Sequence, residues 1–176
     1  MCLLLPVLSD IGNCMKLKTP LPRSVEWSGP NRREYYLDYL VKRHGWTVGV
    51  EVGVRAGRTL FHLLDNNPNL KMYAVDKNVE QFYNDTVKNK YNHRLIVLSG
   101  ASWDQADTIK EPVDFVFVDA GHSTKSVVKD IKAYSPLLKT DQGLTGHDID
   151  FPAVQAALSQ LGIEFDVGPD NVWIKK

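Results

Sequence analysis

The chain has 176 residues, 43% of them hydrophobic and 24% charged, and its 21 lysines and arginines balance 21 aspartates and glutamates. A chain of this length buries roughly 70% of the surface that it exposes when unfolded, so one ordinary domain needs neither disulfides nor a structural metal. The neutral charge excludes the strong positive field that draws proteins to nucleic acids or anionic membranes, and no apolar run reaches the ~20 residues of a transmembrane helix.

The first part of the chain differs from the rest in its lack of periodicity. Residues 1–30 are rich in proline and predict an irregular extension before a folded domain at 31–176. A proline interrupts the apolar opening and no basic residue precedes it, which argues against a signal peptide. Both cysteines, Cys2 and Cys14, lie in the extension and cannot cross-link the core. We therefore expect a cytoplasmic protein, with Met15 as an alternative start.

The predicted elements alternate between helices and short strands. Apolar residues recur at helical spacing in some segments, and short β-branched runs bounded by turn residues lie between them. Ser102, followed by Gln105 three residues later, predicts a capped short helix. The expected order is helix 31–44, strand 46–52, helix 58–64, strand 71–76, helix 79–87, strand 94–98, a short helix from 102, strand 113–118, helix 127–134, strand 144–146 and helix 151–161.

This alternation predicts the fold class. Strands that alternate with helices are typical of a parallel sheet with right-handed crossovers and helices on both faces. The last two strand-like runs, 163–167 and 172–175, are separated by too few residues for a crossover helix and predict an antiparallel hairpin. The predicted fold is therefore α/β, with a doubly wound, mostly parallel sheet and an antiparallel C-terminal hairpin.

Residues that follow the predicted strands are the candidate ligand contacts, because open parallel sheets bind ligands at the carboxyl ends of their strands. Gly53 and Gly57 follow the first strand, where glycine lets the backbone approach a ligand closely. A tight strand-to-helix turn explains two glycines equally well. Asp76 ends the second strand, where a carboxylate can accept the hydrogen bonds of a ribose diol. Together they indicate a cofactor that contains a nucleoside.

Asp119, His122, His147 and Asp148 form a second group of candidates, at the ends of the fourth and fifth predicted strands. Carboxylate and imidazole ligands from adjacent strand ends suit Mg²⁺ or Mn²⁺. A structural explanation stays open, in which Asp119 caps the next helix and His147 only bonds a neighbouring carbonyl.

From about residue 47 to the C-terminus, an ordered set of motifs resembles the class I S-adenosylmethionine-dependent methyltransferases. The set comprises E-x-G-x-x-x-G at 51–57, Asp76, Ser102, D-x-x-H at 119–122 and G-H-D at 146–148. The paired D-x-x-H and G-H-D signatures resemble a small bacterial and phage-type group, which is similar to metal-dependent sugar O-methyltransferases. The resemblance implies a seven-stranded, Rossmann-like methyltransferase fold.

The resemblance also implies roles for single residues in binding S-adenosylmethionine. The turn at Gly53 and Gly57, supported by Glu51, would hold the methionine part of the cofactor. Asp76 would bind the ribose hydroxyls. Ala101, Ser102 and Trp103 would flank the adenine, and Asp119 would face the methionine end of the cofactor and the substrate. For Trp103 a core position stays open as the alternative, because an aromatic residue at the start of a helix is more often part of the core.

The resemblance leaves open whether the site also binds a divalent ion. Asp119 and Asp148 are the metal ligands that the resemblance implies, with Mg²⁺ or Mn²⁺ as the ion. The related sugar and catechol enzymes carry a polar third ligand directly after the second acid, where this chain has Ile149. The third ligand is therefore unassigned by the sequence.

Absent motifs narrow the acceptor. No D-P-P-Y-type segment and no Pro-Cys pair follows the fourth strand, which argues against methylation of base amines or of cytosine C5. The resemblance then implies O-methylation of a small-molecule or saccharide hydroxyl, with His122 or His147 taking the proton. Neither nucleic acid nor membrane is an expected partner, and residues 1–30 or a second subunit of a homo-oligomer would cover the crevice. The alternatives are a metal-dependent hydrolase and a non-catalytic cofactor-binding protein.

Overall fold

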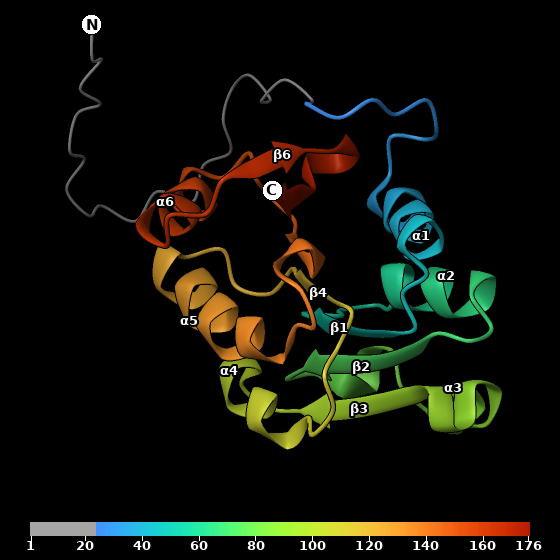
Figure 1. The fold of residues 1–176 in the computed structure, drawn as a ribbon. Coiled ribbons are helices and arrows are strands. Elements are labelled where there is room, and N and C mark those ends of the chain that lie inside the picture. The colour runs from blue at the N-terminus through green and yellow to red at the C-terminus, as the bar shows by residue number, and fades with distance from the viewer. Residues whose placement is uncertain (1–23) are drawn as a thin grey trace, which may run out of the picture.

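The computed structural model describes residues 24–176, so the predictions about Cys2, Cys14 and the start at Met15 lie outside the described residues. The described chain forms one sheet with helices on both faces (Figure 1). Its strands are β1 (Val48–Val52), β2 (Lys71–Asp76), β3 (Leu95–Ser99), β4 (Phe115–Val118), β5 (Leu144–Gly146), β6 (Phe165–Val167) and β7 (Trp173–Lys175).

The sheet has the order β3-β2-β1-β4-β5-β7-β6. The pairs that join β1 to β5 are all parallel, whereas β7 runs antiparallel to both β5 and β6. This confirms the predicted α/β class, the mostly parallel sheet and the C-terminal hairpin. The order reverses between β1 and β4, and the carboxyl ends of strands at such a point border a crevice.

Two helical layers cover the sheet. Helices α1 (Arg33–His44), α2 (Arg58–Asn66) and α3 (Asp85–Tyr91) lie on one face, and α4 (Ser102–Gln105), α5 (Thr124–Tyr134) and α6 (Pro152–Gln160) lie on the other (Figure 1). A hydrophobic core lies on each face of the sheet, and alternate residues of β4 pack into one core or the other, because successive side chains of a strand point to opposite faces. Phe115 and Phe117 pack with α1 and α2, whereas Val116 and Val118 pack with α5 and α6. Within residues 24–176, none of these helices is long and apolar enough to cross a membrane.

Two local predictions were wrong. The helix expected at 79–87 is a 3₁₀ turn, Val79–Gln81, followed by a separate α3. Asn84 starts the new helix, because its side chain accepts a hydrogen bond from the backbone N–H of Val87 at 3.1 Å. Ser102 does not cap α4: Ala101 is the N-cap residue, no side chain caps this helix, and the Ser102 hydroxyl has another partner.

The segment before α1 is fastened to the C-terminal hairpin. The Ser24 N–H donates to the carbonyl of Val167 at 2.9 Å, and the Arg33 N–H donates to Asp170 Oδ2 at 3.1 Å. The Asp170 N–H in turn donates to Asn31 Oδ1 at 3.0 Å. These contacts place the start of α1 beside the carboxyl ends of the central strands.

Candidate functional site

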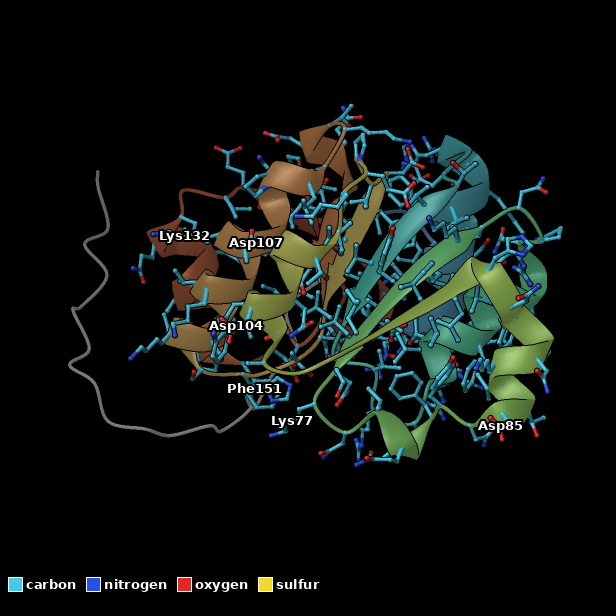
Figure 2. The ribbon with its side chains drawn as sticks, turned by 90° about the horizontal axis from the view of Figure 1, so that it is seen from below. Lys77, Asp85, Asp104, Asp107, Lys132 and Phe151 are labelled. Atoms are coloured by element: carbon cyan, nitrogen blue, oxygen red, sulfur yellow. The ribbon has the colours of Figure 1, made fainter. Side chains whose placement is uncertain are left out.

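A pocket of about 760 Å³ lies at the carboxyl ends of β1 to β5. That volume is typical of small-molecule and cofactor sites. Figure 2 labels two of the residues that border the pocket, Lys77 and Phe151. Glu51 and Gly57 are not among the residues that line it. The predicted site residues that do line it are Gly53, Asp76, Ala101, Ser102, Trp103, Asp119, His122, His147 and Asp148.

Gly53 lets two strand ends approach each other under the pocket. Its φ of +91° lies in the left-handed region, and a Cβ at this position would be 2.4 Å from the carbonyl oxygen of Asp119 and 2.6 Å from Ala120 Cα. Its N–H donates to the carbonyl of Val75 at 2.8 Å. The turn therefore requires glycine both for its dihedral angles and for the space.

Asp76 is held as a carboxylate at the end of β2. Its Oδ2 accepts hydrogen bonds from the N–H groups of Val54 and Arg55 at 2.9 and 2.8 Å, and its Oδ1 accepts from Asn78 at 2.8 Å. Burial alone would raise the pKa of Asp76, but backbone donors, led by Arg55 and Asn78, hold it below its usual 3.8. A ribose diol would share this carboxylate with the glycine turn.

Trp103 belongs to the pocket wall and not to the core. The residue is 37% exposed, so the core alternative for it is wrong. The ammonium of Lys129, from α5, lies 4.3 Å from the indole centroid. The indole therefore lies at the rim of the pocket, beside the Lys129 ammonium.

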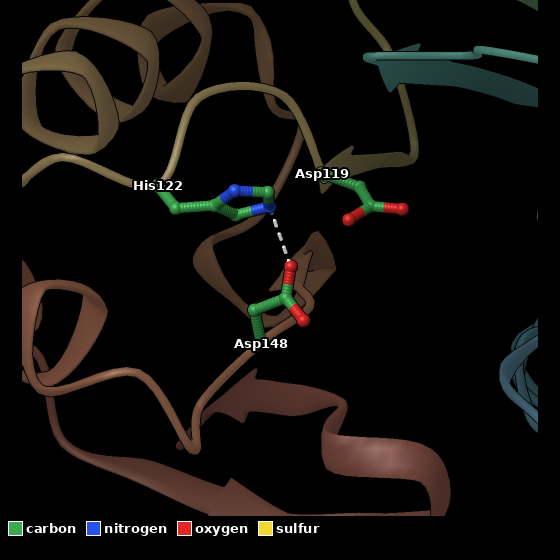
Figure 3. A group of neighbouring side chains, drawn as sticks. All are labelled: Asp119, His122 and Asp148. Carbon is green, nitrogen blue, oxygen red and sulfur yellow. Dashed lines mark ion pairs between the residues drawn. The ribbon is translucent and has the colours of Figure 1, made fainter. Parts of the chain in front are cut away.

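Asp119, His122 and Asp148 converge on one point (Figure 3). His122 Nε2 lies 2.6 Å from Asp148 Oδ2, and the His122 ring stacks on Phe151 with centroids 5.1 Å apart. Asp148 has a φ of +57°, in the left-handed region that aspartate adopts more readily than most residues other than glycine. The alternative that Asp119 caps α5 is wrong, because Ser123 accepts the capping bond.

His147 lies deeper, between two carboxylates. Its Nδ1 is 3.1 Å from Asp148 Oδ1 and 3.4 Å from Asp119 Oδ1. Burial lowers the pKa of His147, but the hydrogen bonds to Asp119 and Asp148 outweigh it and raise the pKa to about 9. His147 thus bonds carboxylates, in contrast to the alternative of a lone carbonyl partner, and is positively charged at neutral pH.

Arg33 adds a second positive charge to this group. Its Nη2 lies 3.4 Å from Asp119 Oδ2. Its Nη1 is almost equidistant from the two ring nitrogens of His147, at 3.2 and 3.3 Å, so it lies over the ring face and not along one lone pair. Arg33 and His147 together balance the charges of Asp119 and Asp148.

The donor set suits a divalent ion in ligand type. One ligand atom from each of Asp119, His122 and Asp148 lies within 4.8 Å of the others. Ile149 is fully buried and lies outside the pocket lining, so it contributes nothing to this group, and His122 is its third member. His122 and Asp148 are already bonded to each other. The competing explanation of this cluster is therefore a pair that transfers a proton without a metal ion.

Comparison with known proteins decides the family. A sequence profile described as a methyltransferase domain matches residues 50–149, which is more than half of the chain. The matched range includes the Gly53 turn, Asp76 and all of the Asp119–Asp148 group. The chain belongs to this methyltransferase family. No curated protein sequence matches the methyltransferase.

Solved structures share the fold of the methyltransferase. It is similar to a TDP-rhamnose 3'-O-methyltransferase of calicheamicin biosynthesis, with a TM-score of 0.62, 15% identity and coverage of 81% of this chain and 78% of that one. It is also similar to an O-methyltransferase of tomaymycin synthesis from Streptomyces achromogenes, in complex with SAM. The TM-score is 0.62, the identity is 14%, and the match covers 81% of this chain and 79% of that one. A Bacillus cereus O-methyltransferase in complex with SAH matches with a TM-score of 0.62 and 17% identity. That match covers 81% of this chain and 80% of the other. These identities show a common fold only.

Two residues were missed from the sequence, one that lines the pocket of the methyltransferase and one that bonds Ser102 in its wall. Arg33 carries no local signal, because only the pairing of residues 24–33 with the distant β6–β7 hairpin brings it to the pocket. Asp130 did carry a signal: it lies on the face of α5 that Val127 and Tyr134 bury. An acid on the apolar face of a predicted helix indicates a buried polar contact.

Replacing Gly53 by alanine is expected to destabilise the methyltransferase more than the same change at Gly45. Gly45 has a φ of +66° with nothing within 4 Å of its missing Cβ, so Gly45→Ala measures dihedral strain alone, about 1 to 2 kcal/mol. Gly53→Ala adds a collision with the backbone of Asp119, for about 1 to 3 kcal/mol more. Urea unfolding of both variants measures the difference, and equal losses would contradict the close approach.

Glu51 is expected to make stability fall as the pH rises. The residue is buried beneath the pocket, and burial, followed by the charges of Asp119 and Asp76, raises its pKa well above 4.5 despite the opposing effect of Arg33. A proton kept only by the folded state stabilises at low pH, and this gain is lost at about 1.4 kcal/mol per pH unit above the unfolded pKa. Glu51→Gln should therefore gain stability relative to the parent as the pH rises above about 4.5 in urea unfolding. The same dependence of the unfolding free energy on pH in both proteins would contradict this prediction.

Proposed function

We propose that this methyltransferase uses S-adenosylmethionine to methylate a hydroxyl group of a small molecule or saccharide. The observation that carries the proposal is the shared pocket: the Gly53 turn and the anionic Asp76 border the same cavity as the Asp119, His122 and Asp148 cluster. The sulfonium of S-adenosylmethionine supplies an activated methyl group. The protein must then align an acceptor oxygen and remove its proton.

The cofactor side of the pocket is assigned to the residues that follow β1, β2 and β3. Gly53 lets the backbone approach the methionine part, and Asp76 binds a ribose hydroxyl with acceptor capacity that its backbone donors leave unused. Ser102 and Trp103 flank the adenine. Glu51 supports the turn from below without lining the pocket, and Gly57 acts through its φ of +77° at the start of α2.

His122 is assigned as the general base. When its Nε2–H donates to Asp148 Oδ2 at 2.6 Å, Nδ1 keeps a lone pair that can accept the proton of a hydroxyl. Asp148 then orients the imidazole, as the acid of a catalytic triad orients its histidine. His147 is the weaker candidate, because it already carries a proton at neutral pH between its two carboxylate partners.

Methyl transfer is tested by incubating the protein with S-adenosylmethionine labelled in its methyl group and a panel of sugars, phenols and alcohols. We expect label on the oxygen of one acceptor class. A metal-dependent hydrolase would leave the cofactor intact and cleave an ester or amide, and would have no use for Asp76 or the Gly53 turn. A non-catalytic binding protein would retain the cofactor without transfer, and label on nitrogen or carbon would contradict O-methylation.

A weak dependence on divalent ions is expected, with Asp119 and Asp148 as the ligands of Mg²⁺ or Mn²⁺ and His122 left as the base. Such an ion would hold the acceptor hydroxyl and lower its pKa. The effect should be modest, because Arg33 and His147 already balance the charges of the two acids. Turnover before and after exhaustive chelation, and after Mn²⁺ is added back, measures it. Unchanged turnover would assign the acids to substrate or cofactor contacts alone.

A further inference from the structure

Ser102 is held from below by two side chains of α5. Its hydroxyl lies 2.5 Å from Asp130 Oδ1, and its carbonyl oxygen accepts a hydrogen bond from the Tyr134 hydroxyl at 2.7 Å. Asp130 and Tyr134 are both fully buried, whereas Ser102 lines the pocket. The backbone and the side chain of Ser102 are therefore fixed at the pocket wall.

The contact with Asp130 decides where the Ser102 proton points. An ionised carboxylate only accepts hydrogen bonds, so the hydroxyl must donate its single proton to Asp130. Burial raises the pKa of Asp130 to about 6, against the lowering effects of the Ser102 hydrogen bond and of Lys129, so the group is ionised at pH 8. The Ser102 oxygen then has only lone pairs left for a ligand in the pocket.

We propose that Asp130 is a positioning residue that makes Ser102 a hydrogen-bond acceptor, and that Ser102 thereby selects a 6-amino purine over a 6-oxo purine in the cofactor. The inference rests on the proposed S-adenosylmethionine site. The amino group of adenine donates to the Ser102 oxygen, whereas the carbonyl of hypoxanthine would place its own lone pairs against it. A site that is matched to a donor discriminates against a ligand that lacks one.

Asparagine at position 130 changes the direction of this hydrogen bond. Asp130 Oδ2 is buried and has no hydrogen-bond partner among the described residues. An asparagine is therefore best accommodated with its carbonyl at the Oδ2 position and its amide N–H donating to Ser102, because the opposite orientation would bury unpaired donors. The Ser102 hydroxyl is then free to donate into the pocket.

The test is calorimetric titration at pH 8 with S-adenosylhomocysteine and with S-inosylhomocysteine, which carries hypoxanthine. We expect the parent to prefer the adenosyl compound by about 10- to 100-fold, and Asp130→Asn to lower this ratio by about 10-fold or more. Ser102→Ala, which removes the acceptor, should also lower the ratio. The two ligands differ at purine N1 as well, but that difference is common to all the proteins and cancels between their ratios.

Asp107→Asn is the matched control, because Asp107 is exposed and lies outside the pocket lining; its ratio should equal that of the parent. A parental ratio in folded Asp130→Asn would overturn the positioning role. If Asp130→Asn does not unfold cooperatively, Ser102→Ala decides, and a parental ratio there overturns the inference. Failure of the parent to bind either compound would instead overturn the proposed cofactor, and the inference with it.

Discussion

Replacing His122 by alanine is expected to lower turnover by about 10²- to 10⁴-fold, the usual contribution of a general base. Cofactor affinity should stay nearly unchanged, because His122 lies on the acceptor side of the pocket with Asp148 and Phe151. The physical reason is the loss of the imidazole nitrogen that accepts the hydroxyl proton. Once an acceptor is known, turnover from pH 5 to 9 and titration with S-adenosylhomocysteine measure the two effects separately.

His147→Ala is the comparison for that prediction. His147 contacts both acids of the cluster, Asp119 and Asp148, but its side chain is only 8% exposed, against 41% for His122. Removing it should lower turnover less than removing His122 does, through disorder of Asp119 and Asp148. Parental turnover in His122→Ala together with a large loss in His147→Ala would move the base to His147. Full activity in both variants would mean that a metal ion or water takes the proton.

Replacing Asp76 by alanine is expected to weaken cofactor binding by about 1.5 to 3 kcal/mol or more, which is at least about 10-fold in affinity. Two effects add up. The variant loses the hydrogen bond to the ribose, and it loses the carboxylate that holds the N–H groups of Val54 and Arg55 at 2.9 and 2.8 Å. The glycine turn then has no anion to order it.

Asp76→Asn separates the two effects, because it keeps the shape but loses the charge and replaces one acceptor with a donor. We expect it to fall between the parent and Asp76→Ala in calorimetric titrations with S-adenosylhomocysteine. Asp85→Asn is the control, since Asp85 begins α3, lies far from Phe151 in Figure 2 and is not among the residues that line the pocket. Unchanged affinity in Asp76→Ala would contradict the ribose assignment.

Much of the fold was predictable because its signals are local. Short apolar strands bounded by turn residues, and the few residues between 167 and 172, predict the parallel sheet and its antiparallel hairpin. The one helix expected at 79–87 failed because periodicity does not detect a cap within an apolar pattern, and Asn84 supplies one. Ser102 failed as a cap because a distant acid, Asp130, competes for its hydroxyl.

The candidate site was predictable where residues follow strand ends. Topology brings Asp76, Asp119 and Asp148 to one edge of the sheet, and one pocket contains them all. Arg33 was not predictable, because its position depends on hydrogen bonds between the segment before α1 and the hairpin at the other end of the chain. The protonation of His147 was also not predictable from the sequence, because its pKa depends on the distances to the carboxylates of Asp119 and Asp148.

A crystal structure of the protein with S-adenosylhomocysteine would test the central claim most directly. The claim is that the pocket binds S-adenosylmethionine with its methyl group facing Asp119, His122 and Asp148. The account predicts the homocysteine end at Gly53, a ribose hydroxyl at Asp76, the adenine between Ser102 and Trp103, and the sulfur turned toward His122. Density for the ligand at another surface would contradict the claim. So would a complex in which the ribose does not contact Asp76, or a pocket that stays empty at saturating ligand.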